Sequence, residues 1–228
     1  MIELSHKPLI RAFNCDCMGF MAGVGDKAYS LACCDPPYGI GEDGKSNSSR
    51  GTLRSPPTIF VSKTWDREKP SDYYFRELRR VSLNQIIFGG NFFLDYLPAT
   101  PCMIVWDKDN TGDFADCELA WTSFKSAVRK FTWRWNGMLQ QNMANKEIRI
   151  HPTQKPVALY RWLLTNYAKP GQRIIDTHGG SFSSAIACWH EGYDMDIVEL
   201  DTEYFEAACE RFERETRQQK LFPTPGGK

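Results

Sequence analysis

The stretch that most constrains the fold is residues 31–41, which read LACCDPPYGIG. Its apolar first half predicts a short buried strand. Pro36 and Pro37 have a fixed φ and no N–H group, so the backbone after Asp35 can neither continue a sheet ladder nor enter a helix. We therefore expect the strand to end abruptly at a carboxylate, with the aromatic ring of Tyr38 close behind it.

The loop after this strand offers two hydrogen-bond acceptors, the Asp35 carboxylate and the Pro36 carbonyl, beside the flat face of Tyr38. Such a set matches an exocyclic amino group on an aromatic ring. Asp-Pro-Pro-Tyr resembles the catalytic motif of amino-methylating DNA methyltransferases, which make N6-methyladenine or N4-methylcytosine. The resemblance implies that Asp35, Pro36, Pro37 and Tyr38 are catalytic, whereas a surface turn in an α/β protein is the alternative interpretation.

Composition narrows the class of protein. A chain of 228 residues suits one α/β domain. Lys+Arg and Asp+Glu balance at 28 each, so any affinity for DNA must be local. No secretory signal or bilayer-spanning run is visible, and we expect a soluble protein of the cytoplasm of a bacterium or phage-infected host, with no membrane partner. The 8 cysteines lack metal-ligand spacing, which predicts free thiols and no metal site.

Strand and helix patterns alternate along the chain. Strands are predicted at 9–15, 84–88, 102–106, 173–175 and 194–201, and helices at 71–81, 157–164, 185–190 and 202–217. This alternation predicts a parallel sheet that binds ligands beyond the carboxyl ends of its strands. Asp35, Asn91 and Asp107 are all expected at that edge.

A second motif, residues 151–156, reads HPTQKP and precedes the helix at 157–164. Amino-methylating methyltransferases carry a nearly identical segment at this place. A rigid turn that feeds a helix start suits Lys155 and backbone N–H groups for the carboxylate of a methyl donor. Without the resemblance, the segment is a proline-capped helix start.

A third motif follows the strand at 173–175, where residues 176–184 read DTHGGSFSS. Strand, glycine turn and helix form the usual nucleotide-binding junction. The family typically has Asp-Pro-Phe-x-Gly-Ser-Gly here, so this chain departs from the pattern at His178 and Phe182. A benzyl group in place of the last glycine puts donor affinity in doubt. We interpret His178 as a ring that packs on the donor rather than a base or metal ligand.

The resemblance implies S-adenosylmethionine as the cofactor. Glu199, at the end of the strand 194–201, is the candidate for the ribose hydroxyls. Asp16 is expected near the adenine of the donor, and a helix N-cap is an equal interpretation of it. The expected cofactor-binding residues are Asp16, Cys17, Asp35, His151, Thr153, Lys155, Asp176, Thr177, His178, Gly180, Ser181, Ser183 and Glu199.

Two segments are candidates for contact with double-stranded DNA. Between residues 125 and 149 a single acid, Glu147, faces several basic residues and tryptophans, a composition that suits phosphate contacts and base stacking. Residues 39–57 form a Gly- and Ser-rich loop, either a flap over DNA or a solvated loop. The DNA-binding candidates are Lys45, Arg50, Arg54, Lys125, Arg129, Lys130, Trp133, Arg134 and Trp135.

The catalytic motif precedes the donor motif, which is the order of the β group of these enzymes. We expect a single domain with a catalytic half (1–124), a short recognition segment (125–149), a donor half (150–217) and a tail (218–228). The resemblance implies a Rossmann-like, mostly parallel sheet of seven strands and methylation of adenine N6 in a flipped-out base. Cytosine N4 methylation and an inactive DNA-binding protein are the alternatives. A homodimer would enlarge so small a recognition surface.

Overall fold

The computed structural model describes residues 7–41, 63, 65–110, 115–136 and 139–217. Its main sheet contains β1 (Ile10–Asn14), β2 (Tyr29–Cys34), β3 (Ser82–Phe88), β4 (Met103–Asp107), β5 (Cys117–Thr122), β6 (Arg129–Thr132), β9 (Arg173–Asp176) and β10 (Asp194–Glu199). The helices are α1 (Cys17–Ala22), α2 (Asp72–Val81), α3 (Val157–Tyr167), α4 (Ser183–Glu191), α5 (Thr202–Arg217) and the short 3-10 helix η1 (Gly90–Phe92). A small hairpin joins β7 (Trp135–Asn136) to β8 (Leu139–Gln140).

The sheet has the strand order β1-β10-β9-β2-β3-β5-β4-β6. Neighbours from β1 to β3 are parallel, and β5 runs antiparallel to both β3 and β4. The expectation of a mostly parallel sheet is confirmed, but the sheet has 8 strands where we expected seven. The additional strand is β6, which pairs with β4. It comes from the segment predicted for recognition, and it covers the edge of β4 that would otherwise leave backbone groups unpaired.

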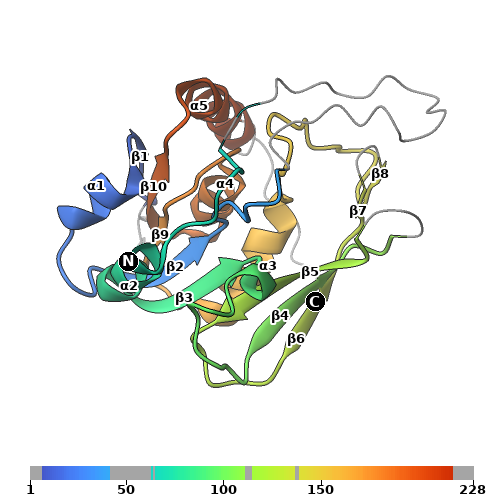
Figure 1. Ribbon diagram of the computed structural model, residues 1–228. Coiled ribbons are helices and arrows are strands. Elements are labelled where there is room, and N and C mark those ends of the chain that lie inside the picture. The colour runs from blue at the N-terminus through green and yellow to red at the C-terminus, as the bar shows by residue number, and fades with distance from the viewer. Residues whose placement is uncertain (1–6, 42–62, 64, 111–114, 137–138, 218–228) are drawn as a thin grey trace, which may run out of the picture.

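Helices cover both faces of the sheet, with α1 and α2 on one face and α3, α4 and α5 on the other (Figure 1). Residues of β2 alternate between the two cores: Leu31 and Cys33 pack with the α3–α5 side, whereas Ala32 and Cys34 pack with the α1–α2 side. A parallel strand buried on both faces needs such a continuous apolar run. The buried strand predicted from residue 31 is therefore the centre of the molecule.

The predicted helices and strands are present with small shifts at their ends. Asp16 caps α1, because its carboxylate accepts a hydrogen bond from the Gly19 N–H at 2.8 Å. Asp201 caps α5 in the same way, at 3.1 Å from the Tyr204 N–H. Helix α4 begins at Ser183, two residues before the expected start. In the part of the chain that the structure describes, every helix is too short or too polar to cross a membrane.

Candidate active site

One cavity lies beyond the carboxyl ends of β2, β9 and β10. Its wall combines residues of both predicted functional loops, the HPTQKP segment and the start of α1. Of the thirteen predicted cofactor-binding residues, the cavity is lined by Asp16, Cys17, Asp35, His151, Thr153, Lys155, Thr177, His178, Gly180, Ser181, Ser183 and Glu199. The parallel sheet explains this convergence, because strands that run in one direction end at one edge.

The Asp35 loop (residues 35–39) follows β2. The Tyr38 hydroxyl donates a hydrogen bond to Asp35 Oδ1 at 2.6 Å, and the Lys155 ammonium donates to Oδ2. The Tyr38 ring stacks on Phe92, with 4.9 Å between ring centroids and 15° between planes. Gly89, at φ +66°, makes room for this ring, because a Cβ there would lie 2.2 Å from Tyr38 Cε1. The glycine after β3 therefore serves a close approach to a neighbouring side chain.

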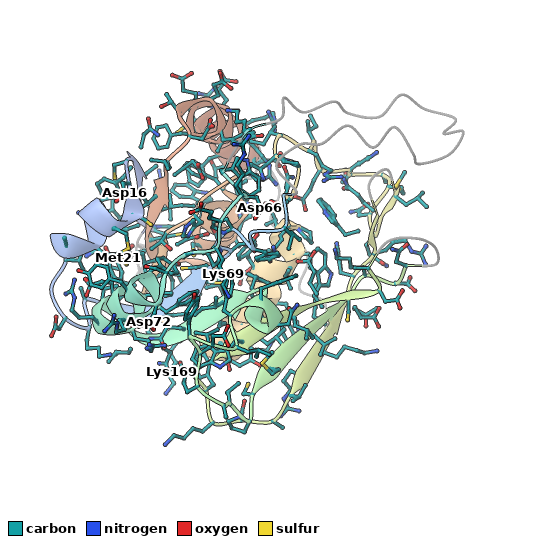
Figure 2. The ribbon with its side chains drawn as sticks, viewed as in Figure 1. Asp16, Met21, Asp66, Lys69, Asp72 and Lys169 are labelled. Carbon is teal, nitrogen blue, oxygen red and sulfur yellow. The ribbon has the colours of Figure 1, made fainter. Side chains whose placement is uncertain are left out.

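Asp66, which is labelled in Figure 2, holds the backbone of the Asp35 loop. Its carboxylate accepts hydrogen bonds from the backbone N–H groups of Tyr38, at 2.7 Å, and Gly39, at 2.9 Å. The Asp66 side chain is buried, with 2% exposed. Sequence reasoning missed this residue, because nothing near Asp66 in the chain marks it as a partner of residues 27 and 28 positions earlier.

A buried ion chain extends from Asp35 into the sheet. Lys155 Nζ lies 3.3 Å from Glu118 Oε2, and Lys108 pairs with the other oxygen of Glu118. Burial raises the pKa of Asp35 above its usual value, although Lys155 opposes this rise. Burial also acts to raise the pKa of Glu118, but the two lysines lower it overall. The pKa of Lys155 is raised, because Asp35 and Glu118 outweigh the effect of burial.

The Gly180 loop (residues 176–183) follows β9, and Glu199 anchors it from the end of β10. Glu199 accepts hydrogen bonds from the Gly180 N–H at 2.7 Å and from the Asp201 N–H at 2.8 Å. Arg211, fully buried on α5, donates to the Ser181 carbonyl at 2.7 Å and to Ser183 Oγ at 2.9 Å. Its other end pairs with Glu147 at 2.7 Å. Arg211 is a second residue that sequence reasoning missed, since it resembles the other charges of an exposed helix.

Phe182 does not stand where the sequence analysis expected it. The residue has φ +58° and ψ +25°, the left-handed conformation that glycine adopts easily. Its ring points into the core, packs edge-on against Phe205 at 5.8 Å and is 2% exposed. Gly179 leaves room for the ring, because a Cβ at that position would lie 2.7 Å from Phe182 Cε1. The benzyl group therefore lies in the core and is not among the residues that line the cavity.

Burial shifts the pKa of two titratable groups of the Gly180 loop toward their neutral forms, so that at pH 7 His178 is uncharged and Asp176 is about half protonated. Burial raises the pKa of Asp176 to about 7, although it accepts hydrogen bonds from Ser184 Oγ at 2.6 Å and the His178 N–H at 3.0 Å. Asp176 is not among the lining residues and lies beneath the loop that it holds. Burial lowers the pKa of His178 to about 4. Its ring packs edge-on against Tyr74 at 5.2 Å and lines the cavity, and its packing on a donor stays a prediction.

The HPTQKP segment forms the wall opposite the Gly180 loop. Burial lowers the pKa of His151 to about 3, and its ring lies 4.3 Å from that of Tyr204 and 5.1 Å from that of Trp65. Thr153 Oγ1 lies 3.1 Å from His151 Nδ1. The cavity is also lined by Pro37 of the predicted catalytic motif and by residues that the sequence analysis did not single out, namely Cys15, Trp65, Gln154, Tyr160, Gly179, Leu200 and Tyr204. Aromatic rings of this kind carry no local signal of function, because core residues have the same composition.

The structure disperses the residues predicted for DNA contact. Lys130 pairs with Asp107 at 3.1 Å, and Arg134 pairs with Asp109. Arg129 pairs with Ile104 near the start of β4. Arg129 and Lys125 therefore lie toward the amino ends of the parallel strands, away from the edge of the sheet that holds Asp35.

The two tryptophans of this segment are less accessible than a stacking role predicts. Trp133 is half-buried and stacks on Phe131 at 6.0 Å. Trp135 is a core residue, 8% exposed, whose indole N–H donates to the Gln154 carbonyl at 2.8 Å. Its alternation with charged residues suggested a surface ring, but the β7–β8 hairpin turns it inward. Lys45, Arg50 and Arg54 lie outside the described residues.

One family model matches the region from β4 into α5. The family model N6_N4_Mtase, described as DNA methylase, matches residues 103–210. The type II methyltransferase M.HpaI of Haemophilus parainfluenzae is 34% identical over 71 residues, which cover 31% of this chain and 23% of the relative. The DNA adenine methyltransferase YhdJ of Escherichia coli (strain K12) is 30% identical over 67 residues, 29% of this chain and 23% of the relative. Both alignments thus cover less than a quarter of the relative's length.

Structural comparison covers most of the chain. The M1.HpyAVI–SAM complex has a TM-score of 0.55 at 18% identity, with 89% of this chain and 100% of that chain covered. The cytosine-N4-specific PvuII DNA methyltransferase has a TM-score of 0.58 at 13% identity, with coverage of 92% and 93%. The fold is therefore that of the class I S-adenosylmethionine-dependent methyltransferases, as expected, apart from the added strand β6.

Proposed function

We propose that this chain, whose residues 103–210 match the DNA methylases of the N6_N4_Mtase family, is an S-adenosylmethionine-dependent DNA methyltransferase that acts on the exocyclic N6 of adenine. One observation carries the proposal: a single cavity is lined both by Asp35 and by the Gly180 loop. A methyl donor on the Gly180 loop and an amino group at Asp35 would therefore meet in one space. Asp35, Pro36, Pro37 and Tyr38 are the proposed catalytic residues.

The residues of the cavity fit the donor. The Gly180 loop exposes backbone near the cavity, since a Cβ on Gly180 would project to 3.9 Å from the His151 ring. Glu199 is oriented by two backbone N–H groups and faces the cavity, where its carboxylate suits ribose hydroxyls. Asp16 and Cys17 line the same end. S-adenosylmethionine supplies an electrophilic methyl group when bound there.

The Asp35 loop is suited to the other reactant. The lone pair of an exocyclic amine is delocalised into its ring, which makes the nitrogen a poor nucleophile. Hydrogen bonds from its two N–H groups to the Asp35 carboxylate and the Pro36 carbonyl favour a pyramidal nitrogen with a localised lone pair. Stacking on Tyr38 contributes about 1–3 kcal/mol toward the few kcal/mol needed to flip the base out of the duplex.

Adenine is preferred over cytosine because Asp rather than Ser precedes Pro-Pro. Cytosine N4 is the alternative, and the similarity to the PvuII enzyme gives it weight. Phe182 and the short recognition segment motivated a second alternative, an inactive DNA-binding protein. The Phe182 ring lies in the core and is not among the residues that line the cavity, which weakens the first of these two grounds. The short recognition segment still favours that alternative.

Double-stranded DNA is the proposed partner. Lys130 and Arg134 lie near the catalytic edge, and their surface carboxylate partners leave them accessible to phosphates. We keep Trp133 as a candidate for stacking and withdraw Trp135 on account of its burial. The recognition segment is short for one subunit, so a homodimer remains part of the proposal.

Calorimetric titration with S-adenosylmethionine, with and without duplex DNA, tests the donor site first. We expect micromolar binding in both conditions. Nucleoside analysis of treated DNA then separates the two bases: N6-methyladenine supports the proposal, whereas N4-methylcytosine moves it to the alternative substrate. Absence of donor binding under both conditions would contradict the proposed function.

A further inference from the structure

The ammonium group of Lys155 is enclosed by acceptors that all belong to the Asp35 side of the cavity. It contacts Asp35 Oδ2, Tyr38 Oη at 3.2 Å and Glu118 Oε2 at 3.3 Å, and the lysine is 4% exposed. An ammonium has three N–H donors and no acceptor. Asp35 and Tyr38 accept two hydrogen bonds from the ammonium, and Glu118 lies within ion-pair distance of it, so its described contacts are to groups of the Asp35 side.

We infer that Lys155 is a positioning residue of the methyl-acceptor site, where it keeps the Asp35 carboxylate ionised and oriented, and that Glu118 holds Lys155 in turn. The inference rests on the proposed function, because it takes Asp35 as the residue that receives the target amino group. It reassigns Lys155, which the motif alone suggested for the donor carboxylate. The Lys155 backbone still serves the donor side, since its carbonyl accepts a hydrogen bond from Ser183 Oγ at 2.7 Å.

The charges of this cluster are balanced. Asp35 and Glu118 contribute two carboxylates, and Lys155 and Lys108 contribute two ammonium groups. The Phe88 ring, 4.7 Å from Lys155 Nζ, gives further stabilisation to the buried cation. A buried charge without a partner is costly in free energy, so each charged group in the series Asp35, Lys155, Glu118 and Lys108 depends on its neighbour of opposite charge.

An ionised Asp35 matters because of the direction of its hydrogen bonds. A carboxylate accepts only, whereas a protonated carboxyl group also presents an O–H donor. Both N–H groups of the target amine are donors, so a protonated Asp35 would face them with the wrong group. An ionised Asp35 also stabilises the positive charge that the amine nitrogen gains when it is methylated.

Every titratable or charged group around Asp35 bears on its ionisation. Lys155 favours the ionised form, the Tyr38 hydroxyl supports it by a hydrogen bond, and Glu118 disfavours it. Farther groups with an electrostatic interaction with Asp35 are Cys33, Tyr160 and Asp176, and Lys108 acts through Glu118. Lys155 and Glu118 thus have opposite effects on the pKa of Asp35: Lys155 lowers it and Glu118 raises it.

This opposition gives a test that a merely structural role would fail. The single-turnover rate of methyl transfer to unmethylated genomic DNA is measured from pH 5 to 9 for the wild type, Lys155→Met and Glu118→Gln. Lys155→Met should move the acid limb of the profile upward by about 1–3 pH units, because an attractive charge is lost. Glu118→Gln should move it downward by a smaller amount, because a repulsive charge is lost. Lys169→Met and Glu206→Gln, both at exposed positions, are the matched controls.

Two further measurements keep the outcomes separate. Calorimetry should show unchanged affinity for S-adenosylmethionine in Lys155→Met; lost donor binding with an unshifted pH profile would return Lys155 to the donor site and overturn the inference. Titration of ¹³C-labelled aspartate carboxyl groups, with the Asp35 signal assigned from Asp35→Asn, should show the same two opposite shifts without any reaction. Shifts in one direction, or none, would also overturn it. If the wild type transfers no methyl group to DNA, the proposed function is wrong. The carboxyl titration alone then tests whether Lys155 and Glu118 shift the pKa of Asp35 in opposite directions.

Discussion

The Asp35 loop and the Gly180 loop follow adjacent strands, β2 and β9, but different forces hold them. Charged side chains from distant parts of the chain hold the Asp35 loop: Asp66 binds its backbone, and Lys155 binds its carboxylate. The Gly180 loop also has charged partners, Glu199 and Arg211, but its backbone conformation contributes as well, because Gly180 and Phe182 have positive φ. Burial favours the neutral forms of Asp176 and His178 in this loop.

This difference separates the two halves of the proposed reaction. Electrostatic stabilisation acts on a charge that develops during the reaction, which is the task of the Asp35 loop. The proposed task of the Gly180 loop is to bind the part of the donor whose charge changes little during the reaction. Backbone N–H groups that come close to the ligand and the shape of the cavity wall suit this task. Variants of the first loop should therefore alter the rate, and variants of the second should alter stability and donor affinity.

Removal of the Asp35 carboxylate gives the largest expected effect. Asp35→Ala should lower the single-turnover rate by about 10²–10³-fold, the usual loss when a group that stabilises the transition state is removed. Donor affinity, measured by calorimetry, should fall much less than the rate because the Gly180 loop is intact. A near-normal rate in this variant would contradict the assignment of Asp35 as a catalytic residue. It would also contradict the proposal that the two loops have different roles.

The neutral character of the Gly180 loop can be tested through stability. The folded state keeps a proton on Asp176 up to about pH 7, whereas the unfolded chain loses it near the ordinary value of 3.8. Rising pH between these values therefore favours the unfolded state. Asp176→Asn keeps an acceptor for the His178 N–H and offers an amide N–H to the Ser184 hydroxyl, which can rotate to accept it. The variant should be more stable than the wild type by roughly 4 kcal/mol above pH 7, with little difference below pH 4.

Urea unfolding at pH 4, 6 and 8 measures this difference. Asp95→Asn is the matched control, because the Asp95 side chain is 83% exposed. If Asp176→Asn and the control follow the wild type equally at every pH, Asp176 is ionised in the folded protein and the loop is not neutral.

Phe182 tests whether core packing and backbone conformation hold the same loop. Phe182→Ala should lower the free energy of unfolding by about 3–5 kcal/mol, as for other buried phenylalanines. Phe182→Gly should be more stable than Phe182→Ala by about 1 kcal/mol, because glycine adopts positive φ without strain. Urea unfolding of both variants measures the contribution of core packing by the ring and the cost of positive φ at a residue with a Cβ. A gain in donor affinity for Phe182→Gly would show instead that the ring obstructs the cavity.

Tyr38 gives the smallest expected effect and sharpens the role of stacking. Tyr38→Phe keeps the ring and loses the hydrogen bond to Asp35, worth about 1 kcal/mol, so the single-turnover rate should fall by roughly fivefold. Tyr38→Trp should also retain much of the activity, whereas Tyr38→Ala should lose more because stacking is worth about 1–3 kcal/mol. Equal losses in Tyr38→Phe and Tyr38→Ala would show that the hydroxyl, rather than the ring, is what matters.

Local signals account for the part of the site that could be predicted. Pro36 and Pro37 end β2, and Gly180 opens the turn after β9, because these residues restrict or free their own backbone. The alternation of apolar runs then fixed the direction of the strands, and with it the edge where Asp35 and Glu199 meet. Twelve of thirteen predicted cofactor-binding residues line one cavity for this reason.

Long-range contacts account for what could not be predicted. Asp66, Glu118 and Arg211 are acids and bases of ordinary local context, and their partners lie 28, 37 and 64 positions away. The inward ring of Trp135 depends on where the β7–β8 hairpin packs. Strand β6 forms because it pairs with the free edge of β4, and no residue near β6 in the sequence indicates that this edge is available.

The sequence by itself determined the class of fold, the order of its elements and the two loops that line the cavity, because prolines, glycines and apolar periodicity act on the backbone within a few residues. Only the tertiary structure decided that Phe182 turns into the core and that Lys155 faces Asp35. Those outcomes depend on space and on partner charges supplied by other strands and helices, which come together only when the chain folds.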